Sequence, residues 1–290
     1  MSLAAADDRS RACLLCGHSV IDSLWEKMPS GIHLGRCRSC GLVYQPRPGD
    51  VASIYGDGYH THWNEKGVAD AKRDTYRFIL DKLPWPAKRA PRVLDVGCAF
   101  GDSLAAIEDK GGEAWGVEFT QALGERLRAR WGGRVSMDDF LNLPYEKNFF
   151  YAVGMIDVIE HFVDPVAVLK HSWEILEPGG WLFLATPDYG SLTRKLLGKY
   201  WEQFKPEHIS YFEFRQLADA CRRIGFVVSR GGNFRKKLQV GYLATTLTRH
   251  SPWIMPGFAV SILRRVPFFW NLQVWFPTDG FILLAQKPLG

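Results

Sequence analysis

The chain has 290 residues, of which 47% are hydrophobic, and it carries a formal net charge of +5 with an isoelectric point near 8.8. This length and apolar content are enough for one large domain, or for a medium-sized domain with a small accessory module. The modest positive charge suits an anionic substrate or a membrane contact, but it falls short of a nucleic-acid-binding footprint. No apolar run approaches the length of a membrane span, and residues 1–9 lack the apolar core of a signal peptide. We therefore expect a cytoplasmic protein.

Four of the six cysteines form two CxxC pairs near the N-terminus: Cys13 with Cys16, and Cys37 with Cys40. In a reducing compartment this spacing favours a metal over disulfides, with redox or incidental cysteines as the alternative. Each pair is followed by glycine, and a polar segment of about 20 residues separates them, which fits the two knuckles of a zinc ribbon. The sequence thus predicts a structural zinc in a module over residues 1–48. Cys98 and Cys221 stand in apolar stretches and are interpreted as core residues.

Residues 49–90 lie between this module and the first predicted strand of the main domain. Residues 54–63 interleave aromatic residues and histidines with glycine, which is typical of a loop. Tyr59, His60 and His62 could close over a ligand as a lid, although solvated loop residues are the simpler interpretation. Residues 65–83 predict a helix that ends before Pro84.

The stretch 93–101 reads Val-Leu-Asp-Val-Gly-Cys-Ala-Phe-Gly, a buried strand that runs into a glycine turn. A helical pattern follows over 102–110, and residues 114–118 read as a second strand that ends in Glu118. A carboxylate at that point can accept hydrogen bonds from both hydroxyls of a ribose. Strand, turn, helix, strand and acid together predict a nucleoside-binding half of a parallel sheet.

Strands and helices continue to alternate along the rest of the chain, which predicts an α/β protein with a helix-flanked, mostly parallel sheet. The expected elements are helix 120–131, a third strand with its turn at 134–140, strand 149–156, helix 165–176, strand 181–187, helix 208–225, a sixth strand after it, and an antiparallel edge strand at 281–287.

The segment 93–101 resembles motif I of the class I S-adenosylmethionine-dependent methyltransferases, with Ala99 in place of the usual middle glycine. Two further segments, Asp-x-x-Glu-His-x-x-Asp-Pro and Leu-x-Pro-Gly-Gly-x-Leu, follow in the order that family requires. The resemblance covers roughly residues 75–230 and implies a seven-stranded Rossmann-like sheet that binds S-adenosylmethionine. It implies cofactor contacts at Asp95, Gly97, Ala99, Gly101, Glu118, Asp139, Phe140 and Asp157. In the family, an acid at the position of Asp139 receives the adenine amino group.

Three constellations could activate a methyl acceptor, of which Tyr59, His60 and His62 in the loop described above are the least favoured. The first is Asp157, Glu160 and His161, because similar patterns in ubiquinone-type O-methyltransferases hold a divalent metal such as Mg²⁺. The alternative is that Glu160 and His161 only cap a helix and shape the pocket.

The second is the segment 206–212, Pro-Glu-His-Ile-Ser-Tyr-Phe, which resembles a His-x-x-Tyr-Phe segment of small-molecule and sugar methyltransferases. In the deoxysugar C-methyltransferases, which also begin with a zinc-binding cysteine module, this histidine is taken as the base. Lys205 stands where that subfamily has a tyrosine, and we expect no counterpart of its C-terminal domain. His208 is the best single candidate for a base, and a helix-capping histidine is the alternative.

Residues 233–278 form an insertion where this architecture usually needs only a hairpin, so 91–290 is interpreted as a methyltransferase domain with this insertion. The segment is rich in Trp, Phe and Arg. We interpret it as a cover for the acceptor pocket or a homodimer contact, with peripheral membrane contact as the alternative.

The sequence therefore predicts a methyltransferase that acts at oxygen or carbon of a small-molecule, sugar or lipid-linked acceptor. An RNA methyltransferase that uses the zinc ribbon on RNA is the first alternative, although the basic residues are dispersed. A non-catalytic zinc-ribbon binding protein is the second.

Overall fold

The computed structural model describes residues 12–290 except 20, 25–27, 29, 50–65 and 251–254. Tyr59, His60 and His62, and with them the predicted lid, lie outside the described residues. None of the helices in the described ranges is long and apolar enough to cross a membrane.

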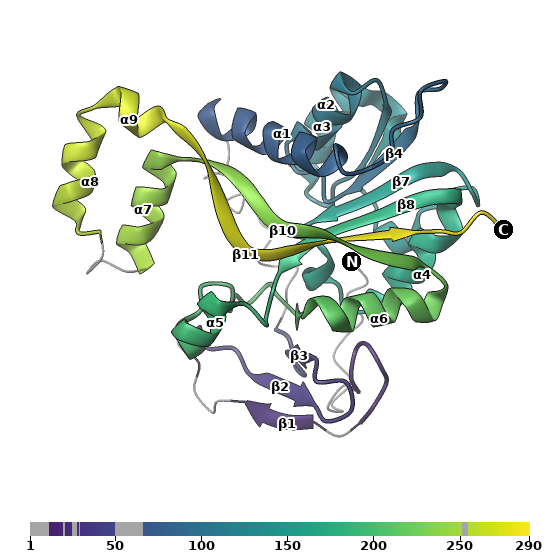
Figure 1. Cartoon of the computed structure of the whole chain (residues 1–290), viewed down its shortest axis with the longest axis horizontal. Helices are drawn as coiled ribbons and strands as arrows, with labels where there is room; N and C mark the ends of the chain where they lie inside the picture. The colour runs from purple at the N-terminus through teal and green to yellow at the C-terminus, as the bar shows by residue number, and fades with distance from the viewer. Residues whose placement is uncertain (1–11, 20, 25–27, 29, 50–65, 251–254) are drawn as a thin grey trace.

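A seven-stranded sheet forms the body of the molecule, with the strand order β10-β11-β8-β7-β4-β5-β6 (Figure 1). Its strands are β4 (Arg92–Val96), β5 (Glu113–Val117), β6 (Val135–Ser136), β7 (Phe150–Ile156), β8 (Leu176–Pro187), β10 (Val227–Gln239) and β11 (Gln273–Gln286). Strands β4 to β8 pair in parallel, and β11 pairs antiparallel with both β8 and β10. The sheet is thus mostly parallel, as predicted.

Helices cover both faces of this sheet, because its central strands are apolar on both sides; every residue of β7 is buried. The helices are α1 (Lys66–Leu80), α2 (Asp102–Asp109), α3 (Gln121–Trp131), α4 (Pro165–Ile175), α5 (Leu192–Leu197), α6 (Phe214–Ile224), α7 (Val240–His250), α8 (Gly257–Arg264) and α9 (Pro267–Asn271). Helices α1, α2 and α3 pack on one face, and α4 and α6 pack on the other (Figure 1).

Two predictions about the C-terminal half were wrong. The last strand is not an edge strand, because β11 inserts between β8 and β10 and hydrogen-bonds to both. The helix expected over 208–225 begins only at Phe214, where Glu213 and Gln216 form a capping box. The residues before it pair as a short strand, β9 (Ser210–Tyr211).

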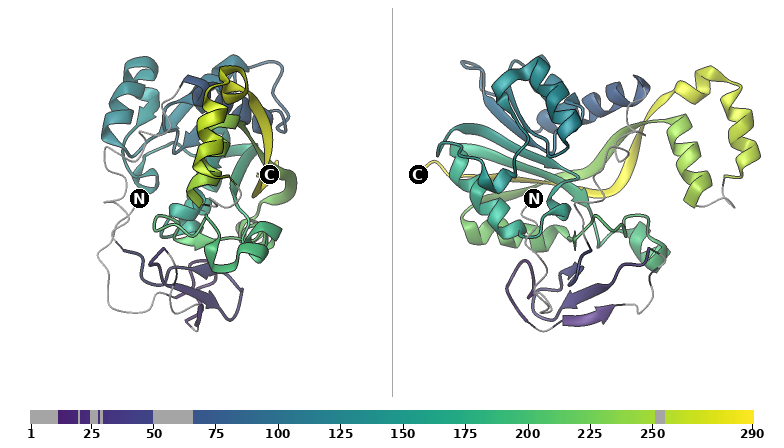
Figure 2. Two further views of the ribbon diagram at one scale, coloured as in Figure 1. Left: turned by 90° about the vertical axis from the view of Figure 1, so that its left-hand side faces the viewer. Right: turned by 180° about the vertical axis from the view of Figure 1, so that it is seen from behind.

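The predicted insertion is narrower than residues 233–278, because both flanking strands extend into it. Residues 235–239 of β10 pair with 273–277 of β11, and three helices, α7, α8 and α9, connect them. The result is a two-stranded arm with a helical end that stands away from the body of the molecule (Figures 1 and 2).

The N-terminal module is joined to the main domain through a strand. Its strands β1 (Ile21–Leu24), β2 (Leu34–Cys37) and β3 (Val43–Tyr44) form an antiparallel sheet whose fourth strand is β9. Val43 pairs with Tyr211 and Tyr44 with Ser210. The module therefore shares a sheet with the segment that contains His208.

Candidate active site and metal centre

The turn after β4 has the conformation expected of a loop that approaches a ligand closely. Gly97 and Gly101 have φ angles of 78° and 82°, which only glycine adopts readily. A Cβ added at Gly97 would lie 2.5 Å from Val158, and one at Gly101 would lie 2.7 Å from Leu127. Ala99 also has a positive φ, 45°, an uncommon value for a residue with a side chain and one that often marks a functional loop.

Asp95, at the end of β4, lies beneath this turn with 1% of its surface exposed. Ser103 of α2 donates a hydrogen bond to its Oδ2 atom, and no partner of Oδ1 exists among the described residues. Burial raises the pKa of Asp95 to about 7. One polar oxygen is thus held at the turn for a ligand or a water molecule.

Glu118 follows β5 and holds the turn in place. Its two carboxylate oxygens accept hydrogen bonds from the amides of Ala99 and Thr120, each at 2.8 Å. Each oxygen keeps a second lone pair, so the carboxylate is oriented and can still accept from the two hydroxyls of a ribose. The structure thus brings Asp95, Gly97 and Glu118 to one edge of the sheet, as the sequence predicted.

Asp139 and Phe140 follow β6 at the same edge. The Asp139 carboxylate accepts a hydrogen bond from the amide of Leu141 at 3.1 Å and so caps a short helical turn. The ring of Phe140 is buried and packs edge-on against His171 at 4.8 Å between ring centroids. Phe140 can therefore offer a cofactor its backbone rather than its ring.

Asp157, directly after β7, is engaged by a residue that the sequence analysis did not single out. Its φ angle is 55°, and its carboxylate forms an ion pair with Lys236 of β10. A charge run such as Arg235-Lys236-Lys237 carries no sequence signal for a partner some 79 positions away.

Glu160, His161 and His208 meet in a buried cluster next to this point. Their ligand atoms lie within 4.8 Å of one another, and the two imidazole rings contact edge-on with centroids 4.9 Å apart. Thr186 of β8 donates a hydrogen bond of 2.9 Å to Oε2 of Glu160, while Oε1 has no partner in the described part of the chain. Asp164 caps α4 and Glu213 caps α6, so neither histidine caps either of these two helices.

Burial controls the charge of this cluster. It raises the pKa of Glu160 to about 8, with a further contribution from the Asp157 carboxylate. It lowers the pKa of His161, and it lowers that of His208 well below the usual value, helped by the neighbouring His161. His161 donates from Nδ1 to the carbonyl oxygen of Glu207 at 2.9 Å, so Nε2 is the basic nitrogen of its neutral ring. Burial thus favours the uncharged form of all three groups.

The predicted Mg²⁺ constellation does not fit this arrangement. Asp157 is neutralised by Lys236, and Glu160 and His161 are 1% and 8% exposed, whereas Mg²⁺ prefers oxygen ligands and keeps several waters. Asp157, Glu160 and His161 therefore lack the solvated oxygen ligands that an Mg²⁺ site needs.

Gln45, which follows β3, fixes the backbone that carries His208, and the sequence analysis missed it. Its side-chain amide donates to the carbonyl oxygens of Pro206 and His208 at 2.9 and 2.8 Å, and its backbone amide donates to Ile209. The one sequence signal for Gln45 is that this polar residue directly follows the apolar stretch Leu-Val-Tyr.

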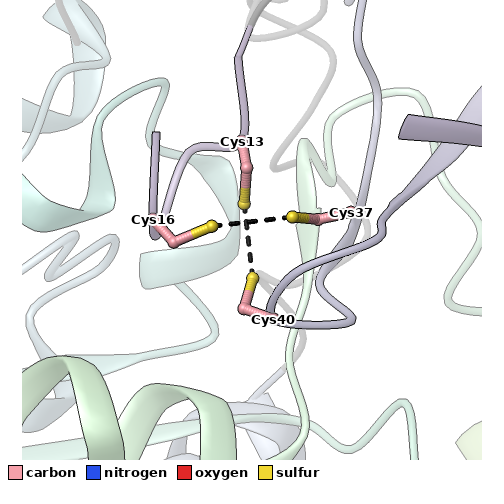
Figure 3. A group of neighbouring side chains, drawn as sticks. All are labelled: Cys13, Cys16, Cys37 and Cys40. Atoms are coloured by element: carbon pink, nitrogen blue, oxygen red, sulfur yellow. Dashed lines mark hydrogen bonds between the residues drawn. The ribbon is translucent and has the colours of Figure 1, made fainter. Parts of the chain in front are cut away.

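The four N-terminal cysteines point toward a common centre from two loops (Figure 3). Their sulfur atoms all lie within 4.8 Å of one another; Cys13 and Cys40 are 3.4 Å apart, and Cys16 and Cys37 are 3.5 Å apart. A tetrahedral zinc with Zn–S bonds of about 2.3 Å separates its sulfurs by about 3.8 Å. The donor set and its spacing fit one Zn²⁺. Cys98 and Cys221 are buried in the core, as predicted.

A family model described as a methyltransferase domain matches residues 67–230, more than half of the chain. The chain belongs to this methyltransferase family. It is a class I S-adenosylmethionine-dependent methyltransferase, as the residues over 93–101 predicted, and S-adenosylmethionine is the cofactor expected for the family.

Sequence relatives match only in part. The chain is 30% identical over 118 residues to a ubiquinone biosynthesis O-methyltransferase of Thiobacillus denitrificans, covering 36% of this chain and 50% of that protein. It is 28% identical over 135 residues to cycloartenol-C-24-methyltransferase 1 of Oryza sativa, covering 43% and 39%. The chain thus spans half or less of the length of these curated relatives. A solved S-adenosylmethionine-dependent methyltransferase from Thermotoga maritima has the same fold, with a TM-score of 0.54, 18% identity, and coverage of 82% and 99%.

Proposed function

We propose that this methyltransferase transfers a methyl group to oxygen or carbon of a small-molecule, sugar or lipid-linked acceptor, with His208 as the base. The observation that carries the proposal is the buried cluster of Glu160, His161 and His208 beside the turn after β4. Gly97 of that turn packs against Val158, two residues before Glu160, so the cluster and the glycine turn are neighbours.

The proposed cofactor site uses the residues at the ends of β4 to β7. Glu118 accepts from the ribose hydroxyls, the turn 97–101 lets the backbone approach the cofactor, and Asp139 and the Phe140 backbone serve the adenine. S-adenosylmethionine supplies an electrophilic methyl group on a sulfonium, so the protein mainly has to position the acceptor.

The cluster suits removal of a proton from the acceptor. A base must be unprotonated at working pH, and burial together with His161 lowers the pKa of His208 and so favours its unprotonated form. His161 packs edge-on against the His208 ring, and its own ring is held by the carbonyl of Glu207. Burial favours the protonated form of Glu160, in which its Oε1 atom can donate a hydrogen bond to an acceptor oxygen. The matched relatives are named as an O-methyltransferase and a C-methyltransferase, and a base serves either reaction.

We further propose that Cys13, Cys16, Cys37 and Cys40 hold one structural Zn²⁺. Four protein ligands close a tetrahedral site, so the metal would organise the module and leave no position for a substrate. The boundaries of the units, 1–48, 49–90 and 91–290, belong to the same proposal.

His208→Asn tests the proposed base. The acceptor is unidentified, so the probe is methyl-tritiated S-adenosylmethionine with a cell extract, and incorporation is counted separately in lipid and water-soluble fractions. We expect a loss of incorporation of about 100-fold or more, because general-base catalysis contributes factors of that order. The affinity for S-adenosylmethionine, measured by calorimetry, should stay unchanged.

His33→Asn, an exposed histidine in the N-terminal module, is the matched control and should keep full activity. Full activity of His208→Asn would refute the assignment of the base. Incorporation into RNA, sensitive to salt, would favour the RNA alternative instead. Two features of the N-terminal module speak against RNA binding. The charge of Arg38 is paired with Asp22, and the edge of β3 is already occupied by β9.

A further inference from the structure

The arm leaves the main sheet at the edge where the parallel strands end. Gly280 of β11 pairs with Pro187, the last residue of β8, and the β11 residues before position 278 pair only with β10. In open α/β sheets, ligands bind at this carboxyl edge. The arm therefore projects from the same edge that carries Glu118 and His208.

Two ion pairs anchor the root of the arm. Lys236 pairs with Asp157 at the end of β7, and Lys237 pairs with Asp74 of α1. Thr75 of α1 also accepts a hydrogen bond from the Lys237 amide at 2.9 Å. These contacts tie the arm to the body beside the proposed active site.

The far end of the arm exposes an unusual amount of apolar surface. We define the arm tip as residues 257–272, which include α8 and α9. Phe258 and Ile262 lie one turn apart on α8 and are 70% and 59% exposed, and Phe268 on α9 is 72% exposed. Phe269 packs edge-on against Phe268 and is itself 52% exposed. Monomeric soluble proteins seldom expose this many large apolar side chains together.

All charged side chains of the arm are basic. Between residues 231 and 278 the sequence contains no aspartate or glutamate. Arg264 and Arg265 are exposed within the arm tip, and the Arg264 guanidinium lies 5.0 Å from the centre of the Trp270 ring. Aromatic rings and arginines side by side are the chemistry expected at the interface of an anionic bilayer.

A second segment at the same edge has a similar character. Helix α5 follows β8 and exposes Leu192 and Leu196, which are 71% and 76% exposed and one turn apart. Tyr200 is 69% exposed, and Lys195 and Lys199 stand between these residues in the sequence. Helix α5 and the arm lie on the same side of the molecule in two opposite views (Figures 1 and 2).

We propose that the arm tip binds the surface of an anionic lipid bilayer, with α5 as a second contact. A bilayer satisfies both features at once, since apolar side chains enter the acyl boundary while arginines meet anionic headgroups. A protein partner would have to bury the two arginines and supply acids for them. The proposal extends the proposed function, because a bound membrane would bring lipid-linked acceptors to the edge that carries His208.

Vesicle flotation of the full-length protein tests this proposal without donor or acceptor. The wild-type protein should float with phosphatidylcholine vesicles that contain phosphatidylglycerol, and salt should release it from them. With vesicles of phosphatidylcholine alone it should remain in the bottom fraction. Arg264→Glu with Arg265→Glu should lower the partition coefficient roughly 25-fold or more, since each basic residue near an anionic surface contributes about fivefold. Phe268→Ala with Phe269→Ala should also reduce flotation.

The matched control is Arg126→Glu with Lys170→Glu, which changes the net charge equally but on α3 and α4. It should float like the wild type, and all variants should keep their affinity for S-adenosylmethionine. No flotation of the wild type at low salt, or equal flotation of every variant, would overturn the proposal. So would a dimer on size exclusion that Phe268→Ala dissociates, because a second copy of the chain would then cover the arm tip. Flotation does not depend on His208, so its failure is distinct from failure of the proposed base.

Discussion

Replacement of Gln45 by leucine should separate positioning of the base from cofactor binding. The Gln45 side-chain amide donates to the partly buried backbone carbonyl of Pro206 at 2.9 Å and to the buried carbonyl of His208 at 2.8 Å. A buried acceptor that loses its donor costs about 1–3 kcal/mol. Loss of the donor to the buried His208 carbonyl alone should therefore lower the free energy of unfolding of Gln45→Leu by about 1–3 kcal/mol. Leucine has a similar size, so the packing of the module should change little.

The effect on turnover follows from the same contacts. A shift of about 1 Å in a catalytic group can cost roughly 100-fold in rate, and Gln45 holds the chain on both sides of Glu207. Tritium incorporation should fall by about 10- to 100-fold. The affinity for S-adenosylmethionine and the zinc content should not change.

Gln216→Ala provides the comparison. Gln216 of α6 donates to the carbonyl oxygen of Cys40 at 3.2 Å, so it also joins the module to the main domain but does not contact the His208 segment. This variant also loses the capping-box bond from the Glu213 amide, so it should lose about 1–2 kcal/mol of stability and keep its turnover. Equal turnover of Gln45→Leu and wild type, despite lost stability, would refute the idea that the module positions His208.

Three further outcomes are expected. Cys37→Ser should reduce zinc from one ion per chain to none by metal analysis of the purified protein; two ions per wild-type chain would show that the histidine cluster also binds metal. Turnover should keep its full value down to below pH 6.5, because burial and His161 hold the pKa of His208 below its usual range; an acidic limb at the ordinary histidine pKa would contradict this. The raised pKa of Glu160 stabilises the fold below about pH 4.3, and this stability is lost as pH rises through about 8. Urea unfolding at several pH values should show this loss in the wild type and in the exposed control Glu202→Gln, but not in Glu160→Gln.

Local patterns were sufficient to predict the glycine turn after β4 and the cysteine cluster. The turn at 97–101 needs residues that tolerate positive φ angles and leave room for Val158 and Leu127, and glycine is the residue that does both. The position of Glu118 was predictable because it directly follows the second strand, and the parallel pairing of β4 with β5 places it beside the turn. In these places a few adjacent residues determine the geometry.

Features that depend on distant segments could not be predicted. The position of β11 inside the sheet depends on its pairing with β8 and β10. The sequence of an apolar strand does not reveal whether the strand lies at the edge or in the interior of a sheet. The His208 segment reads as the start of a helix until β3 is present to pair with it. The ion pair of Asp157 with Lys236 depends on the path of the arm, which no local pattern determines.

The most direct test of the central claim is calorimetric titration of S-adenosylmethionine into the wild-type protein and Glu118→Ala. We expect one site per chain in the wild type. In the variant the affinity should fall by about 100-fold or more, since two hydrogen bonds to a charged group are lost and each contributes about 1.5–3 kcal/mol. Glu125→Ala, which removes an exposed carboxylate from the neighbouring helix α3, should bind like the wild type. Unchanged affinity of Glu118→Ala, or no binding by the wild type, would contradict the proposed cofactor site.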